Sequence, residues 1–196
     1  AMLLQLASQM GLKPLLLGNG TNLLISDKGL DTLVIKTGES LHSIHLLGET
    51  DIFAEAGASM ARLGMFAYKQ SLTGFEFAHG IPGSIGGGVV MNAGAYGGEL
   101  KDVVCEVEAW FPEGVRKLHA EELKFAYRSS IFSEIQGGAV LGVRIHLQKG
   151  ISEQIKARMD ELASKRRASQ PLELPSAGST FKRPEGHFAG TLIEQC

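Results

Sequence analysis

Five glycines and one proline fall within residues 80–88 (GIPGSIGGG), and this cluster limits the folds open to the chain. Glycine allows a positive φ and lets another group approach the backbone closely. Backbone N–H groups exposed in such a segment need acceptors, and phosphate is a good one. A simple connection explains the cluster poorly. We therefore expect a glycine-rich loop that binds an anion, continued by residues 91–99 (MNAGAYGGE).

A second glycine-rich loop is predicted earlier in the chain, at residues 18–24 (GNGTNLL). Its backbone N–H groups can converge on an anion, and Thr21 and Asn22 add side-chain donors. Leu23 replaces the third glycine of a dinucleotide-binding fingerprint, and no helix is predicted to follow. A plain hairpin turn explains this segment equally well when it is taken alone. Together, the two loops suggest a diphosphate held from two sides.

The hydrophobic periodicity predicts a mixture of helices and strands. Amphipathic helices are expected at residues 2–10, 59–72 and 151–167, the second capped by Ser59. Strands are expected at residues 15–17, 23–25, 33–36, 41–47, 51–56, 103–111, 115–119 and 139–147. The sequence therefore predicts an α+β protein, with a boundary near residue 150 where the strand-rich part ends.

The composition limits the partners and the compartment. Lys plus Arg number 19 and Asp plus Glu number 21, so the net charge of −2 favours neither nucleic acid nor an anionic membrane. No apolar run is long enough to span a bilayer, and no signal peptide is visible. Cys105 and Cys196 fit a reducing compartment and match no metal-binding spacing, and the six histidines show no ligand spacing. We expect a cytoplasmic monomer without a metal site.

Four segments in the same order resemble the UDP-N-acetylenolpyruvoylglucosamine reductase family. They are residues 18–24, 80–99, 126–132 (AYRSSIF) and 175–184 (PSAGSTFKRP). The second is the most specific, whereas the first is shared more loosely across the flavin-binding fold of vanillyl-alcohol oxidase type. The short stretch between Phe132 and Ala139 resembles the subtype that lacks an inserted loop with a substrate-capping tyrosine.

The resemblance implies a division of the chain. Residues 1–149 would form an FAD-binding domain of two α+β subdomains, with their boundary near residue 57. Residues 150–196 would begin an α+β substrate-binding domain. Compared with the family the chain is expected to be truncated at both ends, and a catalytic glutamate of the family lies beyond Cys196.

The resemblance also implies the activity and the cofactor contacts. Members use NADPH and bound FAD to reduce UDP-N-acetylglucosamine enolpyruvate to UDP-N-acetylmuramate for peptidoglycan precursor synthesis. The residues expected to bind FAD are Gly18, Asn19, Gly20, Thr21, Asn22, Leu23, Gly80, Ile81, Pro82, Gly83, Ser84, Gly86, Gly87 and Ala93.

The predicted chemistry at the substrate centres on two side chains. By the motif match, Arg128 stabilises the negative charge that develops on the enolpyruvyl group, and Ser179 donates a proton to it. A guanidinium suits the first role because its fork binds a carboxylate with two hydrogen bonds. Tyr127 is expected beside Arg128 at the substrate. His79 precedes the glycine-rich loop, and its role is left open between packing, an approach to the flavin and a covalent link to it, as in some relatives of the wider fold.

Two alternatives remain at the level of the sequence. One is a different flavin oxidoreductase of the same fold, although residues 126–132 and Ser179 belong to the substrate side and argue against it. The other is an inactive fragment or degenerate nucleotide-binding protein, because the expected glutamate lies outside the sequence.

Overall fold

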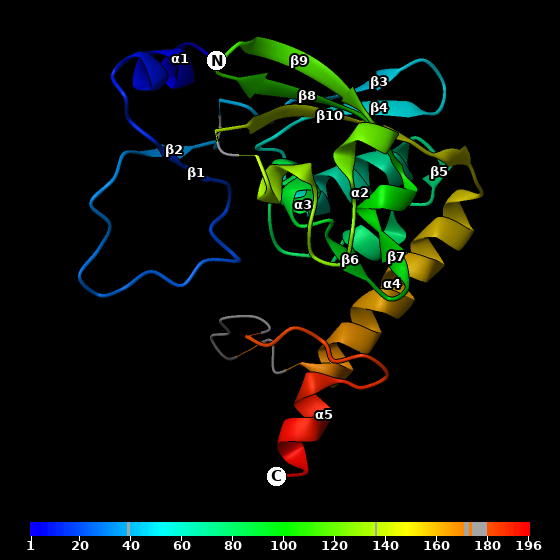
Figure 1. Ribbon diagram of the computed structural model, residues 1–196. Helices are drawn as coiled ribbons and strands as arrows, with labels where there is room; N and C mark the ends of the chain where they lie inside the picture. The colour runs from blue at the N-terminus through cyan, green and yellow to red at the C-terminus, as the bar shows by residue number, and fades with distance from the viewer. Residues whose placement is uncertain (39, 136, 171–172, 174–179) are drawn as a thin grey trace.

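The computed structural model describes residues 1–38, 40–135, 137–170, 173 and 180–196. Its centre is a five-stranded sheet in the order β3-β4-β10-β8-β9, in which every neighbouring pair is antiparallel (Figure 1). The strands are β3 (Ile44–Leu47), β4 (Asp51–Glu55), β8 (Val104–Phe111), β9 (Gly114–His119) and β10 (Ala139–His146).

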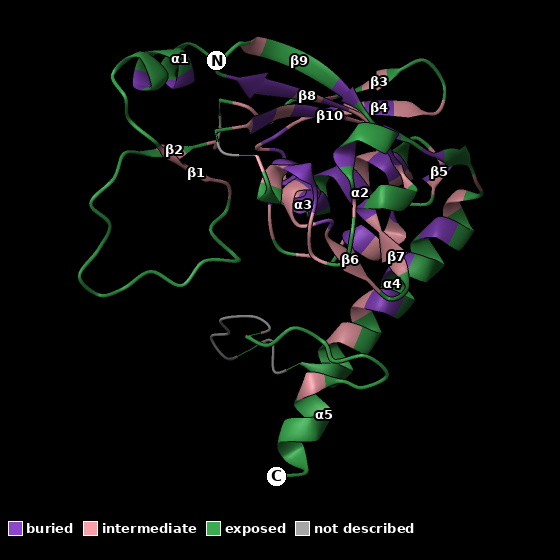
Figure 2. Cartoon of the chain, viewed as in Figure 1, coloured by how far each residue is buried: buried purple, intermediate pink, exposed green. Residues whose placement is uncertain are grey.

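One face of this sheet forms the core. Along β4 the burial alternates, so that Ile52 and Ala54 are fully buried between half-buried neighbours. Helices α2 (Met60–Lys69) and α3 (Ile85–Val90) contribute to the same core cluster, which Figure 2 shows as the buried centre of the molecule. Ser59 caps α2 as predicted, its side chain accepting the Arg62 N–H.

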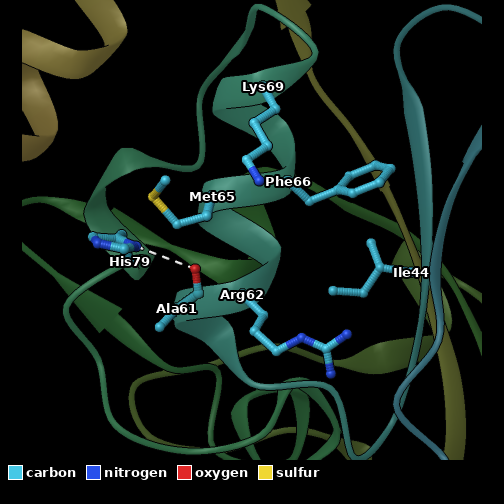
Figure 3. A pocket seen from close by; sticks show the side chains of 7 residues that line it. All are labelled: Ile44, Ala61, Arg62, Met65, Phe66, Lys69 and His79. Carbon is cyan, nitrogen blue, oxygen red and sulfur yellow. Dashed lines mark hydrogen bonds between the residues drawn. The ribbon is translucent and has the colours of Figure 1, made fainter.

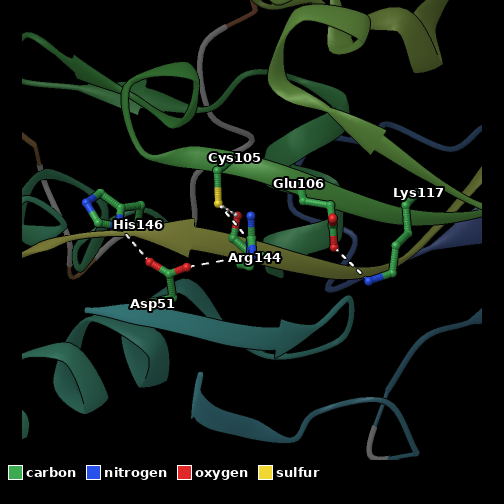
Figure 4. Close-up of polar contacts among 6 residues, drawn as sticks. All are labelled: Asp51, Cys105, Glu106, Lys117, Arg144 and His146. Carbon is green, nitrogen blue, oxygen red and sulfur yellow. Dashed lines mark hydrogen bonds and ion pairs between the residues drawn. The ribbon is translucent and has the colours of Figure 1, made fainter. Parts of the chain in front are cut away.

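The other face of the sheet carries polar pairs (Figure 4), whereas Trp110 on the same face packs against α1. His146 lies opposite Asp51 in the register, and its Nδ1 is 2.6 Å from an Asp51 carboxylate oxygen. Arg144 is 3.8 Å from the same carboxylate, and Lys117 pairs with Glu106 at 3.0 Å. Such surface pairs, whose acidic partners are only partly exposed, contribute about 0–1 kcal/mol each to stability.

The N-terminal part is attached to one end of the sheet. Helix α1 (Met2–Gln9) is followed by β1 (Leu15–Leu17) and β2 (Val34–Lys36), which pair in parallel. A second, smaller cluster joins Leu4 of α1 to Trp110 of the main sheet. This part extends to one side of the molecule in Figure 1.

Two expectations for the N-terminal part need correction. The helical spacing predicts an apolar face of Leu3, Leu6, Ala7 and Met10 on α1, and this face is mostly exposed. Ala7 is buried, but Leu3, Leu6 and Met10 line an open hollow beside β2. The strand predicted at residues 23–25 is wrong, because these residues are exposed and have no β partner. An apolar run without a neighbouring strand does not form a ladder.

Helix α4 (Ser152–Ser169) packs its apolar stripe of Ile155, Met159 and Leu162 against α2 and the short helix η1 (Glu76–Ala78). The remaining elements are β5 (Leu72–Thr73), β6 (Gly94–Ala95), β7 (Gly98–Glu99), β11 (Gln148–Lys149), α5 (Ala189–Glu194), η2 (Leu100–Asp102), η3 (Ala120–Leu123) and η4 (Ile131–Ser133). None of the helices in the described part of the chain has the length and apolarity of a membrane span.

Candidate functional site

The expected loop at residues 80–88 is only partly a loop. It ends at Ser84, whose side chain accepts the Gly87 N–H at 3.4 Å, and α3 begins at Ile85. Gly86 and Gly87 are therefore helical. The sequence favoured a loop because three consecutive glycines oppose a helix by roughly 1 kcal/mol each. Tertiary packing overrides this preference.

Packing explains two of the three helical glycines. A Cβ on Gly86 would lie 2.9 Å from the carbonyl oxygen of Ala56, and one on Gly88 would lie 2.9 Å from Leu100. Because Gly86 and Gly88 have no side chains, α3 can pack closely against η2 and against the residue that follows β4. Gly87 differs, because it is exposed and its Cβ would meet only the Ser84 Oγ at 3.5 Å. The predicted cofactor contacts of Gly86 and Gly87 stay predictions.

The structure brings the two glycine-rich loops together, as the sequence led us to expect. Thr21 donates its hydroxyl to the Pro82 carbonyl at 3.1 Å, across 61 residues of sequence. Gly18 packs directly on Ser84 and leaves no space for a side chain. Gly83 has φ +136°, and a Cβ there would lie 3.2 Å from the Thr21 Oγ1. Residues 18–22 and 80–84 thus form one surface, which we call the glycine cradle.

The glycine cradle presents unused backbone donors. Within the described residues, the N–H groups of Gly20, Thr21, Asn22 and Ser84 make no hydrogen bond to the protein. Gly20 has φ +72°, the left-handed conformation found in anion-binding nests. The N–H of Ile85 at the start of α3 is already bonded to the Ala58 carbonyl at 2.8 Å. The donors for an anion therefore come from the loops and not from the end of the helix.

The remaining residues predicted to bind the cofactor are Asn19 and Ile81 within the cradle, Leu23 beside it and Ala93 after α3. Asn19 and Leu23 are exposed on the first loop. Ile81 packs against the core, and its N–H donates to the Ala78 carbonyl at 3.0 Å. Ala93 follows α3, and its N–H closes the helix end by bonding the Gly88 carbonyl at 2.8 Å.

Arg128 lies in a tight turn at residues 126–129, with φ +54°. Its Nη2 donates to the Gly94 carbonyl at 3.1 Å, and its guanidinium lies 5.5 Å from the centre of the Tyr127 ring. The Tyr127 hydroxyl accepts the backbone N–H of Arg183 at 3.2 Å. The C-terminal segment therefore reaches the turn that holds Arg128.

Asn92 supports this turn, although it was not among the predicted site residues. Its side chain is fully buried and its φ is +40°. Its amide nitrogen donates to the Ala126 carbonyl and to Glu99, both at 3.1 Å, and its oxygen accepts the Lys101 N–H at 3.0 Å. The signal available in the sequence was an asparagine, a residue that tolerates positive φ, inside a glycine-rich motif.

Glu99 gives this region a fixed negative charge. Its hydrogen bond and ion pair with Lys101, at 2.7 Å, lower the pKa of its carboxyl below the ordinary value, against an opposing effect of burial. Asn92 and Arg128 lower that pKa further. The Glu99 carboxylate in turn raises the pKa of Lys101. Glu99 is therefore ionised at neutral pH and partly balances the cations around the Arg128 turn.

Ser179, the predicted proton donor, lies outside the described residues, and its role stays a prediction. His79 lies on the side of α2, where its Nδ1 is 3.2 Å from the Ala61 carbonyl oxygen (Figure 3). It lines an open hollow of about 390 Å³ with Ile44, Ala61, Arg62, Met65, Phe66 and Lys69. In the part of the chain that can be described, no three His, Cys, Asp or Glu side chains are grouped as metal ligands.

The fold and the paired loops place the chain in the class of FAD-binding proteins. Residues 1–118 match the family model described as "FAD binding domain". Residues 170–196 match a second model, described as "UDP-N-acetylenolpyruvoylglucosamine reductase, C-terminal domain".

Curated and solved relatives narrow the class further. The chain is 51% identical over 179 residues to the UDP-N-acetylenolpyruvoylglucosamine reductase of Syntrophomonas wolfei, covering 91% of this chain and 59% of that protein. For the reductase of Clostridioides difficile the identity is 46% over 193 residues, with 98% and 63% covered. The chain thus spans about three fifths of these relatives.

The crystal structure of the reductase from Thermus caldophilus is similar with a TM-score of 0.84 and 36% identity, covering 97% of this chain and 68% of that one. An alkyldihydroxyacetonephosphate synthase shares only the fold, at a TM-score of 0.55 and 15% identity over 76% of this chain and 29% of that one. The chain belongs to the UDP-N-acetylenolpyruvoylglucosamine reductase family.

Proposed function

We propose that the protein to which this chain belongs is an FAD-dependent oxidoreductase that reduces UDP-N-acetylglucosamine enolpyruvate to UDP-N-acetylmuramate with NADPH, in peptidoglycan precursor synthesis. The observation that supports it most is the meeting of the two glycine-rich loops, since Thr21 bonds the Pro82 carbonyl beside unused backbone donors. The substrate is proposed from the names of the relatives, which are UDP-N-acetylenolpyruvoylglucosamine reductases.

The glycine cradle fits the diphosphate of FAD. Its free N–H groups belong to Gly20, Thr21, Asn22 and Ser84, and such groups bind phosphate oxygens well. When bound, FAD would supply the hydride chemistry that links NADPH to the methylene carbon of the enolpyruvyl group. The chain must therefore hold this cofactor and place the substrate against it.

Helix α3 sets the distance between the cradle and the proposed substrate side. Ser84 begins α3 at the cradle, and the carbonyl of Val90 at its other end accepts the Ser130 hydroxyl at 2.9 Å, beside the Arg128 turn. Six helical residues span about 9 Å. A ligand extended along α3 therefore reaches from the anion donors to the Arg128 turn.

Arg128 and Ser179 are proposed to complete the reduction. Hydride addition to the methylene carbon places negative charge on the carbon next to it and on the attached carboxylate. Arg128 has one of its five N–H donors bonded to another described residue, so its fork can bind that carboxylate. Ser179 gives its hydroxyl proton to the charged carbon, which balances the hydride with one proton. Tyr127 lies beside Arg128 at the same site.

The proposed domain division, oligomeric state and compartment also rest on the resemblance and the composition. We assign residues 1–149 to the FAD-binding domain and residues 150–196 to the start of the substrate-binding domain. The subdomain boundary near residue 57 falls in the connection between β4 and α2. A net charge of −2 gives no general attraction to nucleic acid or anionic membranes, and we propose a cytoplasmic monomer.

An absorption spectrum of the intact protein tests this proposal. Anaerobic NADPH should bleach the flavin bands, and UDP-N-acetylglucosamine enolpyruvate should restore them. Bleaching without recovery would favour a different flavin oxidoreductase of this fold, and a protein that cannot be loaded with FAD would contradict the proposal.

Variants separate the two half-reactions. Arg128→Ala and Ser179→Ala should keep flavin reduction by NADPH and lose most of the recovery by substrate, because both act on the enolpyruvyl group. Arg158→Ala is the matched control, since Arg158 is exposed on α4 and pairs only with Glu161 among the described residues. Normal recovery in Ser179→Ala would refute the proton-donor role.

A further inference from the structure

A charged residue occupies the last position of the buried stripe of α4. Ile155, Met159 and Leu162 are buried at helical spacings of four and three residues. The next position in that pattern is Arg166, which is half-buried. A cation on the packed face of a helix needs a polar partner there.

The partner of Arg166 belongs to the glycine cradle. Its Nη1 donates to the carbonyl of Gly80, which lies 86 residues earlier in the sequence. Other cations of α4 are bonded within the helix instead: Lys156 pairs with Asp160, and both Arg158 and Lys165 pair with Glu161. Those pairs stay within α4. Arg166 instead connects α4 to the loop at residues 80–84.

The shape of Gly80 suits this contact. A Cβ on Gly80 would lie 3.6 Å from the Arg166 Nη1 and 3.7 Å from its Cδ, so the arginine side chain lies along the bare backbone. Backbone bonds hold the loop on either side: Ile81 N–H donates to the Ala78 carbonyl, and Met60 N–H to the Gly83 carbonyl at 3.1 Å. The Gly80 carbonyl is thus held from α4 by a charge-assisted hydrogen bond.

We propose that Arg166 is a positioning residue for the glycine cradle: by fixing the Gly80 carbonyl it keeps residues 80–84 in the conformation that meets Thr21. Helix α4 ends at Ser169, directly before the part that matches the C-terminal domain of the reductases. The cofactor side of the site therefore depends on the position of α4. That the ligand is FAD rests on the proposed function, whereas the positioning of the loop does not.

Hydrogen exchange of the intact, ligand-free protein tests the positioning by itself. Arg166→Ala should speed exchange several-fold in peptides that report the Ile81 and Met60 amides, because these N–H groups donate to the Ala78 and Gly83 carbonyls and open when the loop loses its anchor. Arg158→Ala, a matched change on the same helix, should leave these peptides unchanged. Equal exchange in the two variants would overturn the proposal. If Arg166→Ala does not fold, Arg166→Lys decides, since a lysine keeps the charge and lacks the reach of the guanidinium fork.

FAD titration by flavin fluorescence then tests the consequence for the site. Arg166→Ala and Arg166→Lys should both weaken FAD binding about tenfold, the effect of losing one charge-assisted hydrogen bond. The loss should persist at high salt. Normal binding by Arg166→Lys, with a salt-sensitive loss in Arg166→Ala, would show simple attraction between charges and overturn positioning. If the unaltered protein binds no FAD, the proposed function fails. The exchange experiment still decides whether Arg166 positions the loop.

Discussion

Neighbouring glycines in α3 should respond in opposite ways to the same substitution. Gly86→Ala should destabilise the protein, and Gly87→Ala should stabilise it. Both residues are helical, so alanine gains the same helix propensity at each position, roughly 1 kcal/mol. The difference between the two variants therefore measures tertiary packing alone.

The structure gives the size of that packing effect. A Cβ on Gly86 would lie 2.8 Å from the Ala56 Cβ and 2.9 Å from the Ala56 carbonyl oxygen, which are backbone-fixed atoms that cannot rotate away. Overpacking of this kind costs about 1–3 kcal/mol, and the fixed neighbours favour the upper end. After the gain in helix propensity, Gly86→Ala should lose about 2 kcal/mol. Gly87→Ala has an exposed Cβ and should gain about 0.5–1 kcal/mol.

Urea unfolding of the three proteins measures both values, provided that the slopes agree. A Gly86→Ala variant as stable as the unaltered protein would refute the packing reasoning. FAD titration adds a second comparison, because Gly87 is predicted to contact the cofactor. A Gly87→Ala variant that is more stable and yet binds FAD weakly would place that glycine at the ligand.

Three further predictions concern the site. Asn92→Ala should cost about 3 kcal/mol in urea unfolding, because it leaves buried partners unsatisfied and puts alanine at a positive φ; a loss below about 1 kcal/mol would contradict its supporting role. Glu99 has a lowered pKa, so its pairing with Lys101 stabilises the fold above the ordinary carboxyl pKa of 4.5 and stops doing so as the pH falls through the lowered value. The stability difference from Glu99→Gln should therefore shrink below pH 4.5 in acid titrations of unfolding, and a constant difference would disprove the coupling. Thr21→Val should weaken FAD binding about fivefold without changing stability, because it removes the bond to Pro82 at an exposed position, and unchanged affinity would argue against the paired cradle.

The strands of the main sheet and the longer helices could be predicted from the sequence. Alternating β-branched and polar residues mark β8 and β10, and Ser59 marks the start of α2. In these elements the local preference and the tertiary packing agree. The pattern therefore gives their type and their approximate bounds.

Helix α3 could not be predicted in the same way. Gly86 and Gly88 leave room for Ala56 and Leu100, which are far from α3 in the sequence or separated from it by turns. The absent strand at residues 23–25 has the opposite cause, since the local preference was present and the pairing partner was not. Both errors concern contacts that no local pattern reports.

The candidate site was predicted in part. The pairing of the two loops was expected from their glycines and is confirmed by the Thr21 bond to Pro82. The assignments of Arg128 and Ser179 came from the resemblance and stay predictions. Asn92 and Arg166 were missed, because each acts through a backbone carbonyl of a distant segment, and such an acceptor has no signature in the sequence.

The order of strands in the main sheet has a consequence for the synthesis of the chain. Strand β10 lies between β4 and β8 and is the last of the five to be translated. Until residues 139–146 leave the ribosome, the β3-β4 and β8-β9 hairpins have no strand to join them, and their inner edges stay open. The nascent chain should therefore stay sensitive to proteases and prone to association until β10 emerges, and then gain protection in one step.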